Sequence, residues 1–321
     1  MAVYTRLSRN DITQFLAQYT LGELREFHPI QEGIENTNYL IITSEGKFIL
    51  TLFENRVNEK DIPFFIELKK YLASCGIACP KPMIDQDGRL FSVLANKPAV
   101  IVSFLHGRGV EHIEGFHLPA LGEQLANMHN AVEGFHQTRQ NDLSIKGWQQ
   151  LFDKMATKLN LVDPALESMI NKELDFLNVS WDFDIPRGVI HADLFPDNVF
   201  FEDETLTGVI DFYFACTDYF AYDLAICINA WCFDPAWNFK PNFAASLVKA
   251  YHRQRPLSET EISALSVLLR GAAIRFLLTR SYDFINQVPG ALVKVKNPHE
   301  YSTKLAFHQQ HPVSDWLPVM V

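Results

Sequence analysis

The 321-residue sequence lacks any long apolar run. A membrane-spanning helix needs about 18 or more consecutive, mainly apolar residues, and we expect no such segment in this chain. Residues 1–16 also lack the long apolar segment that signal peptides contain. We therefore expect no membrane partner, and we expect the protein to be cytoplasmic.

Cysteine is scarce, and its spacing excludes two kinds of stabilised scaffold. The five cysteines are Cys75, Cys79, Cys216, Cys227 and Cys232. Their number is odd and they form no paired Cys-x-x-Cys knuckles, so we expect neither a disulfide framework nor a structural zinc site. Free thiols fit a reducing compartment.

Runs of Lys and Arg are absent as well. The 28 Lys and Arg residues are outnumbered by 38 Asp and Glu residues, which gives a formal net charge of −10. An acidic surface repels the phosphates of nucleic acids, so we expect no nucleic-acid partner. A nucleotide stays compatible with this charge, because it binds in a local pocket together with its own magnesium ion.

The hydrophobic pattern divides the chain into two regions, with no internal repeat or low-complexity linker. Strand-like apolar segments occur at 39–43, 47–53, 90–94 and 99–104, and a helical pattern covers 61–74. Further along, the candidate helices are 116–132, 146–159, 164–177, 222–232, 242–253 and 258–286. We therefore expect an α+β chain with two lobes. A small antiparallel-sheet lobe would cover 1–103, a connector 104–109 and a larger helical lobe 110–321, and ligands favour clefts between such lobes.

The densest group of polar residues in an apolar setting lies between 189 and 212. His191 and Asp193 are followed by Asn198, and Asp211 ends the next apolar run. Phosphoryl transfer needs one carboxylate to orient the incoming hydroxyl, and amide and carboxylate oxygens to hold magnesium. The pattern matches the catalytic-loop template of protein kinases. It predicts Asp193 as the base, Asn198 and Asp211 as magnesium ligands, and His191 as a residue that fixes the loop by hydrogen bonding.

Two apolar runs flank the acidic turn 202–206 and predict a β-hairpin. If the turn is centred between Glu204 and Thr205, Asn198 lies opposite Asp211. Directly opposed residues have Cβ atoms about 4.5–5.5 Å apart, so this pair could share one magnesium ion. A slip of one residue would undo the argument. The alternative interpretation is a hairpin without chemistry.

This segment resembles the catalytic motif of the aminoglycoside-phosphotransferase-like kinases, a superfamily that includes choline kinases and homoserine kinases. The resemblance implies a protein-kinase-like fold, with a five-stranded amino-terminal lobe, an adenine-binding connector and a helical lobe that forms the acceptor site. Further stretches resemble the homoserine kinase branch: 32–39, 48–54, 223–234 and the long carboxyl-terminal segment 271–301. This narrower resemblance implies phosphorylation of homoserine, in threonine biosynthesis, with ATP and Mg²⁺.

Five residues match nucleotide-binding positions. Asn36, Thr37 and Asn38 lie between two predicted strands, where a phosphate-covering loop belongs. Backbone N–H groups with Asn and Thr side chains cradle phosphate oxygens, although an Asn-rich turn would look the same. Ser103 and Leu105 match the adenine-binding connector by position, through mostly main-chain contacts.

The sequence departs from the superfamily at Thr51, where these kinases place a Lys or Arg on the third strand to hold the phosphates. Lys47 is four residues away, about 13 Å at roughly 3.3 Å per residue, and is a poor substitute. The sequence therefore does not identify the cation that binds the phosphates. It does not identify the carboxylate expected on the following helix either, although Glu67 is the candidate.

The apolar helix 271–286 contains Arg275 and Arg280. A buried guanidinium needs an anionic partner, and these two point about 140° apart, so both do not face one small ligand. Arg275 shares a face with Tyr282, and our hypothesis is that Arg275 binds the substrate carboxylate in a bidentate manner. The alternative is an internal salt bridge, for instance with Asp283.

Two further acidic residues have open roles. Asp197 is next to Asn198 and could reach the ammonium group of the acceptor, or it could be a turn residue. Asp223 is interpreted as a helix N-cap, and the resemblance implies that it also supports the catalytic loop.

Rival functions are a kinase for choline, an amino sugar or a methylthio-sugar, a pseudokinase, and a metallohydrolase that uses His191, Asp193 and Asp211. The sequence does not predict the oligomeric state.

Overall fold

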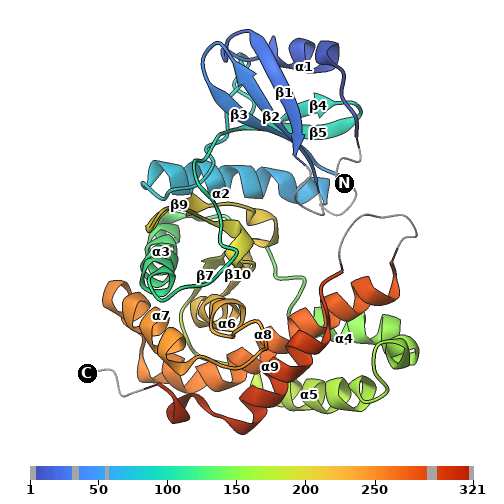
Figure 1. Cartoon of the computed structure of the whole chain (residues 1–321), viewed down its shortest axis with the longest axis vertical. Helices are drawn as coiled ribbons and strands as arrows, with labels where there is room; N and C mark the ends of the chain where they lie inside the picture. Colours follow the sequence, from blue (N-terminus) through green and yellow to red (C-terminus); the bar gives the residue numbers. More distant parts are fainter. Residues whose placement is uncertain (1–4, 31–35, 55–57, 288–294, 318–321) are drawn as a thin grey trace. The chain divides into compact units, whose positions relative to one another are not determined.

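The computed structural model describes residues 5–30, 36–54, 58–287 and 295–317 (Figure 1). These residues form two compact units. The first comprises the described part of Met1–Gly107 together with Thr207–Tyr213, and the second contains the rest of the described chain. The predicted two-lobed α+β fold, with an antiparallel sheet followed by a larger helical region, is confirmed.

The division differs from the predicted boundaries because Thr207–Tyr213 returns to the first unit. Val209 N donates a hydrogen bond to Ala78 O over 2.9 Å, and Thr207 Oγ1 donates one to His106 O over 2.7 Å. A segment remote in sequence thereby carries Asp211 into the sheet-containing unit.

The first unit is built on a five-stranded antiparallel sheet in the order β1-β2-β3-β5-β4. Its strands are β1 (Leu24–Ile30), β2 (Thr37–Thr43), β3 (Lys47–Leu52), β4 (Ser92–Leu94) and β5 (Lys97–Ser103). Burial alternates strictly along β2, so one face of this strand lies on a core. Gly46, with φ of 145°, forms the tight turn between β2 and β3.

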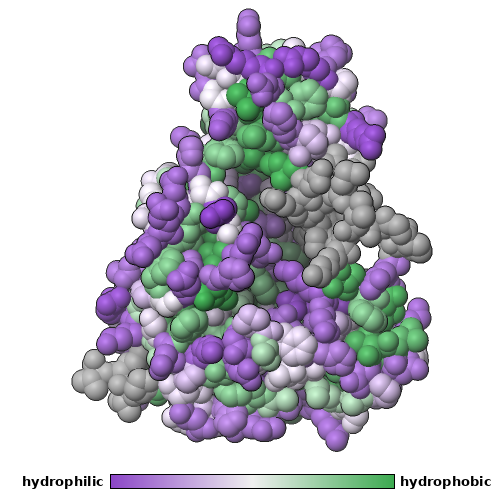
Figure 2. All heavy atoms as spheres, in the orientation of Figure 1, coloured by the Kyte–Doolittle hydropathy of each residue, from purple (hydrophilic) through white to green (hydrophobic). Residues whose placement is uncertain are grey.

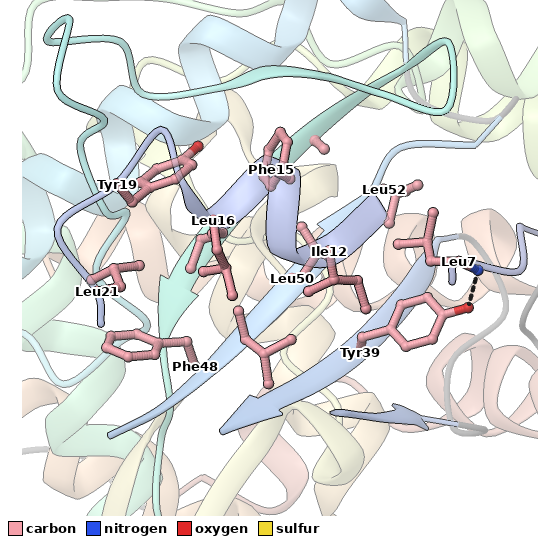
Figure 3. Packing of buried hydrophobic residues seen from close by; sticks show 13 residues of the cluster. Leu7, Ile12, Phe15, Leu16, Tyr19, Leu21, Tyr39, Phe48, Leu50 and Leu52 are labelled. Atoms are coloured by element: carbon pink, nitrogen blue, oxygen red, sulfur yellow. Dashed lines mark hydrogen bonds between the residues drawn. The ribbon is translucent and has the colours of Figure 1, made fainter. Parts of the chain in front are cut away.

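A short helix covers one face of this sheet. In α1 (Arg9–Leu16), Ser8 and Asp11 form a capping box that satisfies the first turn. The apolar side of α1 packs against side chains of β2 and β3 (Figure 3). Tyr39 fixes the entry to α1, because its hydroxyl accepts a hydrogen bond from Leu7 N over 3.0 Å.

Helix α2 (Ile62–Ser74) follows the 3₁₀ turn η1 (Glu59–Asp61) and takes part in a second hydrophobic core of the first unit. Ile62 and Ile66 of this helix pack with Phe53, Val100 and Val102. The buried side of α2 also includes one charged residue, a lysine that is described below.

The second unit is mainly helical. Its helices are α3 (His117–Ala131), α4 (Ile145–Met155), α5 (Leu166–Ser180), α6 (Phe220–Trp231), α7 (Pro241–Gln254), α8 (Glu259–Ile285) and α9 (His299–Gln310). Its 3₁₀ turns are η2 (Val132–Gly134), η3 (Ala156–Leu161), η4 (Pro196–Asn198) and η6 (Val313–Asp315), and η5 (Phe212–Phe214) lies at the change of unit. Short strands accompany them: β6 (Arg108–Gly109), β7 (Arg187–Ile190), β8 (Val199–Glu202) and β10 (Cys216–Tyr219); β9 (Thr205–Val209) leads into the first unit.

Helices α3 and α7 approach each other closely (Figure 1). Gly122 lies at this contact, and a Cβ atom added there would overlap the carbonyl oxygen of Leu247. Strand β7 pairs antiparallel with β10, so that Ile190 lies opposite Cys216. Helix α6 follows β10 directly, and the pairing therefore places the start of α6 beside the end of β7.

Helix α8 forms much of the core of this unit. By length and composition it could cross a membrane, which the sequence analysis did not expect, but 67% of its apolar window is buried inside the protein. Those are the properties of a core helix. On the face drawn in Figure 2, hydrophilic side chains predominate on each unit and hydrophobic ones are scattered among them.

Candidate active site

The loop that follows β7 contains the predicted base. Its backbone turns sharply at Ala192, whose φ of 64° lies in the left-handed region that non-glycine residues rarely adopt. Both His191 N and Ala192 N donate 2.8 Å hydrogen bonds to the carboxylate of Asp223. One buried carboxylate thus holds two successive peptide groups, which stabilises a conformation that would otherwise be costly.

Asp223 lies in the first turn of α6, whose N-cap is Tyr219. The N-cap interpretation of Asp223 is therefore wrong, since its carboxylate bonds the loop backbone. Burial by itself would raise the pKa of Asp223, but the hydrogen bond from His129 and the groups of His191 bring it below its ordinary value. The side chain is 0% exposed and is a charged acceptor for the loop.

His129 on α3 connects Asp223 to a second helix. Its Nε2 lies 3.2 Å from Asp223 Oδ2, and its Nδ1 lies 2.7 Å from the hydroxyl of Tyr251 on α7. Burial lowers the pKa of His129 and favours the neutral ring. A neutral ring that donates from Nε2 to the carboxylate and accepts from Tyr251 at Nδ1 satisfies all three groups. The sequence analysis missed His129, because its partners lie 94 and 122 residues away.

His191 and Asn198 surround Asp193. The Nδ1 atom of buried His191 accepts a hydrogen bond from Asp193 N over 3.2 Å. The Nδ2 atom of Asn198 donates to Asp193 O over 2.8 Å and to Asp193 Oδ2 over 3.3 Å. The predicted base and one predicted metal ligand are therefore neighbours, and Asp193 itself is half-buried. With Nδ2 used in this way, Oδ1 is the amide atom of Asn198 that offers metal-binding chemistry.

Asp211, the other predicted magnesium ligand, belongs to the first unit. It follows β9 and has a φ of 64°. The register that would set it opposite Asn198 stays a prediction. Amide and carboxylate oxygens fit magnesium, which usually binds one or two protein oxygens together with substrate phosphates. The described residues contain no group of three His, Cys, Asp or Glu side chains that could hold a metal ion.

The predicted phosphate-covering residues lie just before and at the start of β2, and they bond to residues at and just beyond the end of β3. Asn36 Oδ1 accepts from Glu54 N over 3.3 Å, and Thr37 Oγ1 donates to Glu54 Oε1 over 2.7 Å. Asn38 Oδ1 accepts from Thr51 Oγ1 over 2.7 Å. Contacts with phosphate stay a prediction for these three residues, and the preceding Gly33–Glu35 stretch lies outside the described residues.

The predicted adenine-binding positions lie at and just beyond the end of β5. Ser103 Oγ accepts a 2.9 Å hydrogen bond from Lys81 N, and Ser103 N donates to Lys81 O over the same distance. Leu105 packs against Gly208, since a Cβ atom at Gly208 would lie 2.7 Å from Leu105 Cδ2. Both residues are half-buried.

Thr51 is buried on β3 and pairs with Asn38 and Val100. Glu67 lies on the exposed side of α2, where it forms a 3.7 Å ion pair with Lys70. The buried ionisable residue of this helix is Lys69 instead. Lys69 was missed, although a lysine three residues after Ile66 on an apolar helix side is a visible signal.

Arg275 is 2% exposed and lies between the rings of Phe214 and Phe276, at 5.5 and 4.6 Å from their centroids. Its Nη1 atom donates a hydrogen bond to the carbonyl of Ala192. The predicted carboxylate contact of Arg275 stays a prediction. Tyr282, seven residues along the same helix, is 38% exposed.

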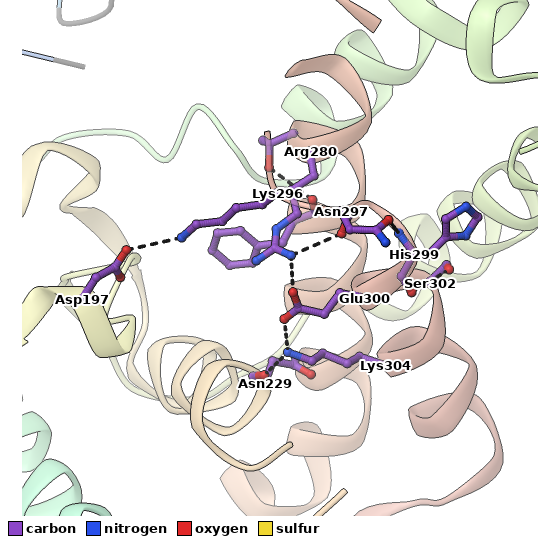
Figure 4. Close-up of polar contacts among 11 residues, drawn as sticks. Asp197, Asn229, Arg280, Lys296, Asn297, His299, Glu300, Ser302 and Lys304 are labelled. Atoms are coloured by element: carbon purple, nitrogen blue, oxygen red, sulfur yellow. Dashed lines mark hydrogen bonds and ion pairs between the residues drawn. The ribbon is translucent and has the colours of Figure 1, made fainter. Parts of the chain in front are cut away.

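Asp197 is exposed beside the loop and pairs with Lys296 over 3.4 Å (Figure 4). Lys296 also lies 5.1 Å from the ring centroid of Phe195. Among the other polar residues drawn in Figure 4, Arg280 pairs with Glu300, which also binds Lys304 over 2.6 Å. Arg280 therefore has the internal anionic partner that a buried guanidinium needs.

Known proteins resemble this chain over nearly its whole length. Residues 26–260 match the family described as "Phosphotransferase enzyme family". The homoserine kinase of Rhodospirillum rubrum is 50% identical over 309 residues, covering 96% of each chain. The homoserine kinase of Methylobacterium radiotolerans is 48% identical over 310 residues, covering 97% of each chain.

Solved structures of lower sequence identity share the fold. An amicoumacin kinase in complex with AMP-PNP, Ca²⁺ and Ami has a TM-score of 0.71 at 17% identity, with 96% of this chain and 94% of that chain covered. A choline kinase from Cryptosporidium parvum has a TM-score of 0.67 at 14% identity, with 94% and 95% covered. The predicted protein-kinase-like fold is confirmed.

Proposed function

Since this chain belongs to the homoserine kinases of the phosphotransferase enzyme family, we propose that it transfers the γ-phosphoryl group of ATP to the hydroxyl of L-homoserine. The observation that carries the proposal is the near-half identity to two homoserine kinases over 96–97% of the chain. The product would be O-phospho-L-homoserine, an intermediate on the way to threonine. The cytosol is the proposed location.

Asp193 is the proposed base. Its carboxylate takes the hydroxyl proton while the substrate oxygen forms a bond to the γ-phosphorus and the bond between phosphorus and the ADP oxygen breaks. The contacts of Asp193 N with His191 and of Asp193 O with Asn198 support this role, because they fix the backbone of Asp193, and Asn198 Nδ2 also contacts its carboxylate before the substrate arrives. Magnesium, held by Asn198 Oδ1 and the Asp211 carboxylate, would neutralise phosphate charge.

The remaining assignments are proposals for the two substrates. Backbone groups of Asn36–Asn38 would cover the phosphates, and main-chain groups of Ser103 and Leu105 would bind adenine. Asp197 would bind the ammonium group of homoserine. Its exposed ion pair with Lys296 supports this, because a substrate ammonium can replace a lysine ammonium there.

Two roles compete for Arg275. The sequence assigns it, with Tyr282 beside it, to the carboxylate of homoserine. Its burial and its bond to Ala192 O support a positioning role for the catalytic loop instead. The two roles predict different kinetics, and the corresponding experiment is described in the Discussion.

The proposed function is tested by measuring ADP release with Mg²⁺ against L-homoserine, L-serine, choline and kanamycin in parallel. Turnover that is specific for L-homoserine is expected. Turnover with choline or kanamycin and none with homoserine would overturn the acceptor and keep the reaction class. Absence of turnover with all four, together with tight ATP binding, would favour a pseudokinase.

A further inference from the structure

Helix α2 buries a lysine that no step of the proposed reaction uses. Lys69 is 4% exposed and lies on the side of the helix that also carries Ile62 and Ile66. Within the described residues, no carboxylate oxygen lies within ion-pair distance of its Nζ atom. A buried ammonium without an anion is costly, so such a residue indicates that an anion binds nearby.

The contacts of Lys69 bring it next to the strand position that lacks a cation. Its Nζ atom lies 3.4 Å from the hydroxyl of Tyr213, and the side chain of Thr51 lies close enough to the same hydroxyl to lower its pKa slightly against the larger effect of burial. The ring of Tyr213 is fixed by edge-to-face contacts with Phe53 and Phe65, at centroid distances of 5.1 and 5.8 Å. The hydroxyl of Tyr213 thus lies near both the end of Lys69 and Thr51, the residue that stands where related kinases place Lys or Arg.

Lys69 also lies within electrostatic reach of Asp211, the proposed magnesium ligand. Burial lowers the pKa of Lys69 to about 8, and the Cys79 thiol and the Asp211 carboxylate oppose this shift. Burial raises the pKa of Tyr213, and the Asp211 carboxylate adds to this shift. A desolvated ammonium beside a carboxylate that is proposed to bind magnesium suits a triphosphate. The phosphate oxygens would bind the ammonium directly and the carboxylate through the magnesium ion.

Three other lysines of the first unit have contacts of their own. Lys47 lies over the ring of Phe104, at 5.6 Å from the centroid. Lys97 is paired with Glu54. Lys70 is on the exposed side of α2 and is paired with Glu67.

We propose that Lys69 is the cation that binds the nucleotide triphosphate in this chain, and that it is supplied by helix α2 in place of strand β3. This inference rests on the proposed use of ATP. It accounts for the missing cation at Thr51, because the positive charge is carried by helix α2 and not by strand β3. Tyr213 lies between Lys69 and Thr51.

The test compares Lys69→Met, Lys69→Gln and Lys69→Arg with Lys70→Met as the matched control on the same helix. Binding of MgATP is measured by calorimetry, and Tm is measured with and without MgATP. We expect Lys69→Met and Lys69→Gln to weaken MgATP binding at least about tenfold, as for loss of a charge-assisted bond. We expect Lys69→Arg to retain part of the affinity and Lys70→Met to retain all of it.

The Tm of the ligand-free protein separates binding from packing. Because replacing an unpaired buried charge with an apolar side chain relieves desolvation, Lys69→Met should keep or raise this Tm while it loses the stabilisation by MgATP. Unchanged MgATP affinity in both neutral variants would overturn the proposal. Calorimetry needs no acceptor, so failure of homoserine turnover with intact, Lys69-dependent MgATP binding would refute the proposed acceptor alone.

Discussion

Arg275 on helix α8 donates a hydrogen bond to the carbonyl of Ala192, the residue directly before the proposed base Asp193. The N–H of the same Ala192 is bound by Asp223 from α6. One left-handed residue is therefore held at its N–H by an anion and at its carbonyl by a cation, both buried. Charge-assisted bonds of this kind are the stronger class of hydrogen bond, which explains how the loop keeps its shape without a substrate.

Arg275→Ala should lower kcat by about ten- to a hundredfold and leave the KM for homoserine within about threefold, because the loss is one of loop geometry. Steady-state kinetics with homoserine and with 3-aminopropan-1-ol, which has no carboxylate, check this. A positioning role predicts the same loss for both acceptors. A large rise in KM for homoserine with unchanged turnover of the aminoalcohol would show instead that Arg275 binds the carboxylate.

Asp193→Asn should reduce kcat by about 10²–10⁴-fold, since the amide cannot take the hydroxyl proton. The shape and hydrogen bonds of the side chain are nearly kept, so the affinity for MgATP should change little. The measurement is kcat together with MgATP binding by calorimetry. Asp197→Asn is the control four residues along, for which the effect should fall on the KM for homoserine. An undiminished kcat in Asp193→Asn would remove the base from the mechanism.

Asp211→Asn should raise the Mg²⁺ concentration needed for half-maximal rate by about tenfold or more, because one anionic ligand becomes a neutral one. Chelation with EDTA should abolish turnover in the unmodified protein, and added Mg²⁺ should restore it. Asp203→Asn is a suitable control, since Asp203 is an exposed turn residue that also has a positive φ. Identical magnesium curves for the two variants would contradict the metal assignment.

Stability should fall as the pH falls below about 6.5, the ordinary pKa of histidine. Burial, with smaller contributions from Lys304 and His311, lowers the pKa of His308 to about 3. Between these two values the unfolded chain binds the proton and the folded chain does not. Proton binding by the unfolded chain therefore lowers the free energy of unfolding by up to about 1.4 kcal/mol for each unit by which the pH falls.

Urea unfolding between pH 7 and pH 5 measures this dependence. His308→Gln should flatten the curve, and His112→Gln, at an exposed position, should leave it unchanged. His129 would retain part of the slope in both variants, because burial lowers its pKa too. Parallel curves for His308→Gln and the unmodified protein would exclude His308 as a source of the pH dependence.

Local sequence patterns predicted the elements whose signals are local. The helix predicted over 258–286 is α8 at Glu259–Ile285, where Ser258 and Glu261 form a capping box. The strands at 39–43 and 47–53 follow from dense apolar and β-branched residues around a glycine turn. Helix α9 was not predicted, because its buried side includes Lys304 and His308 and therefore shows no apolar period.

The parts of the site that sequence reasoning missed depend on contacts between distant segments. Lys69 and Tyr213 are 144 residues apart, and His129 and Asp223 are 94 apart. No spacing rule connects such pairs, since they meet only when two elements pack. The loop pattern itself was visible because Asp193 and Asn198 are five residues apart and bond directly.

The close contact at Gly122 makes the loop that carries the proposed base depend on a remote position. Helix α3 carries His129 and helix α7 carries Tyr251, and the two side chains together support Asp223. Any side chain at Gly122 would force these helices apart at the carbonyl of Leu247. A change that removes no polar group would then also displace the loop that carries the proposed base. We therefore expect a substitution at this glycine to disturb that loop as well as to loosen the packing of α3 against α7.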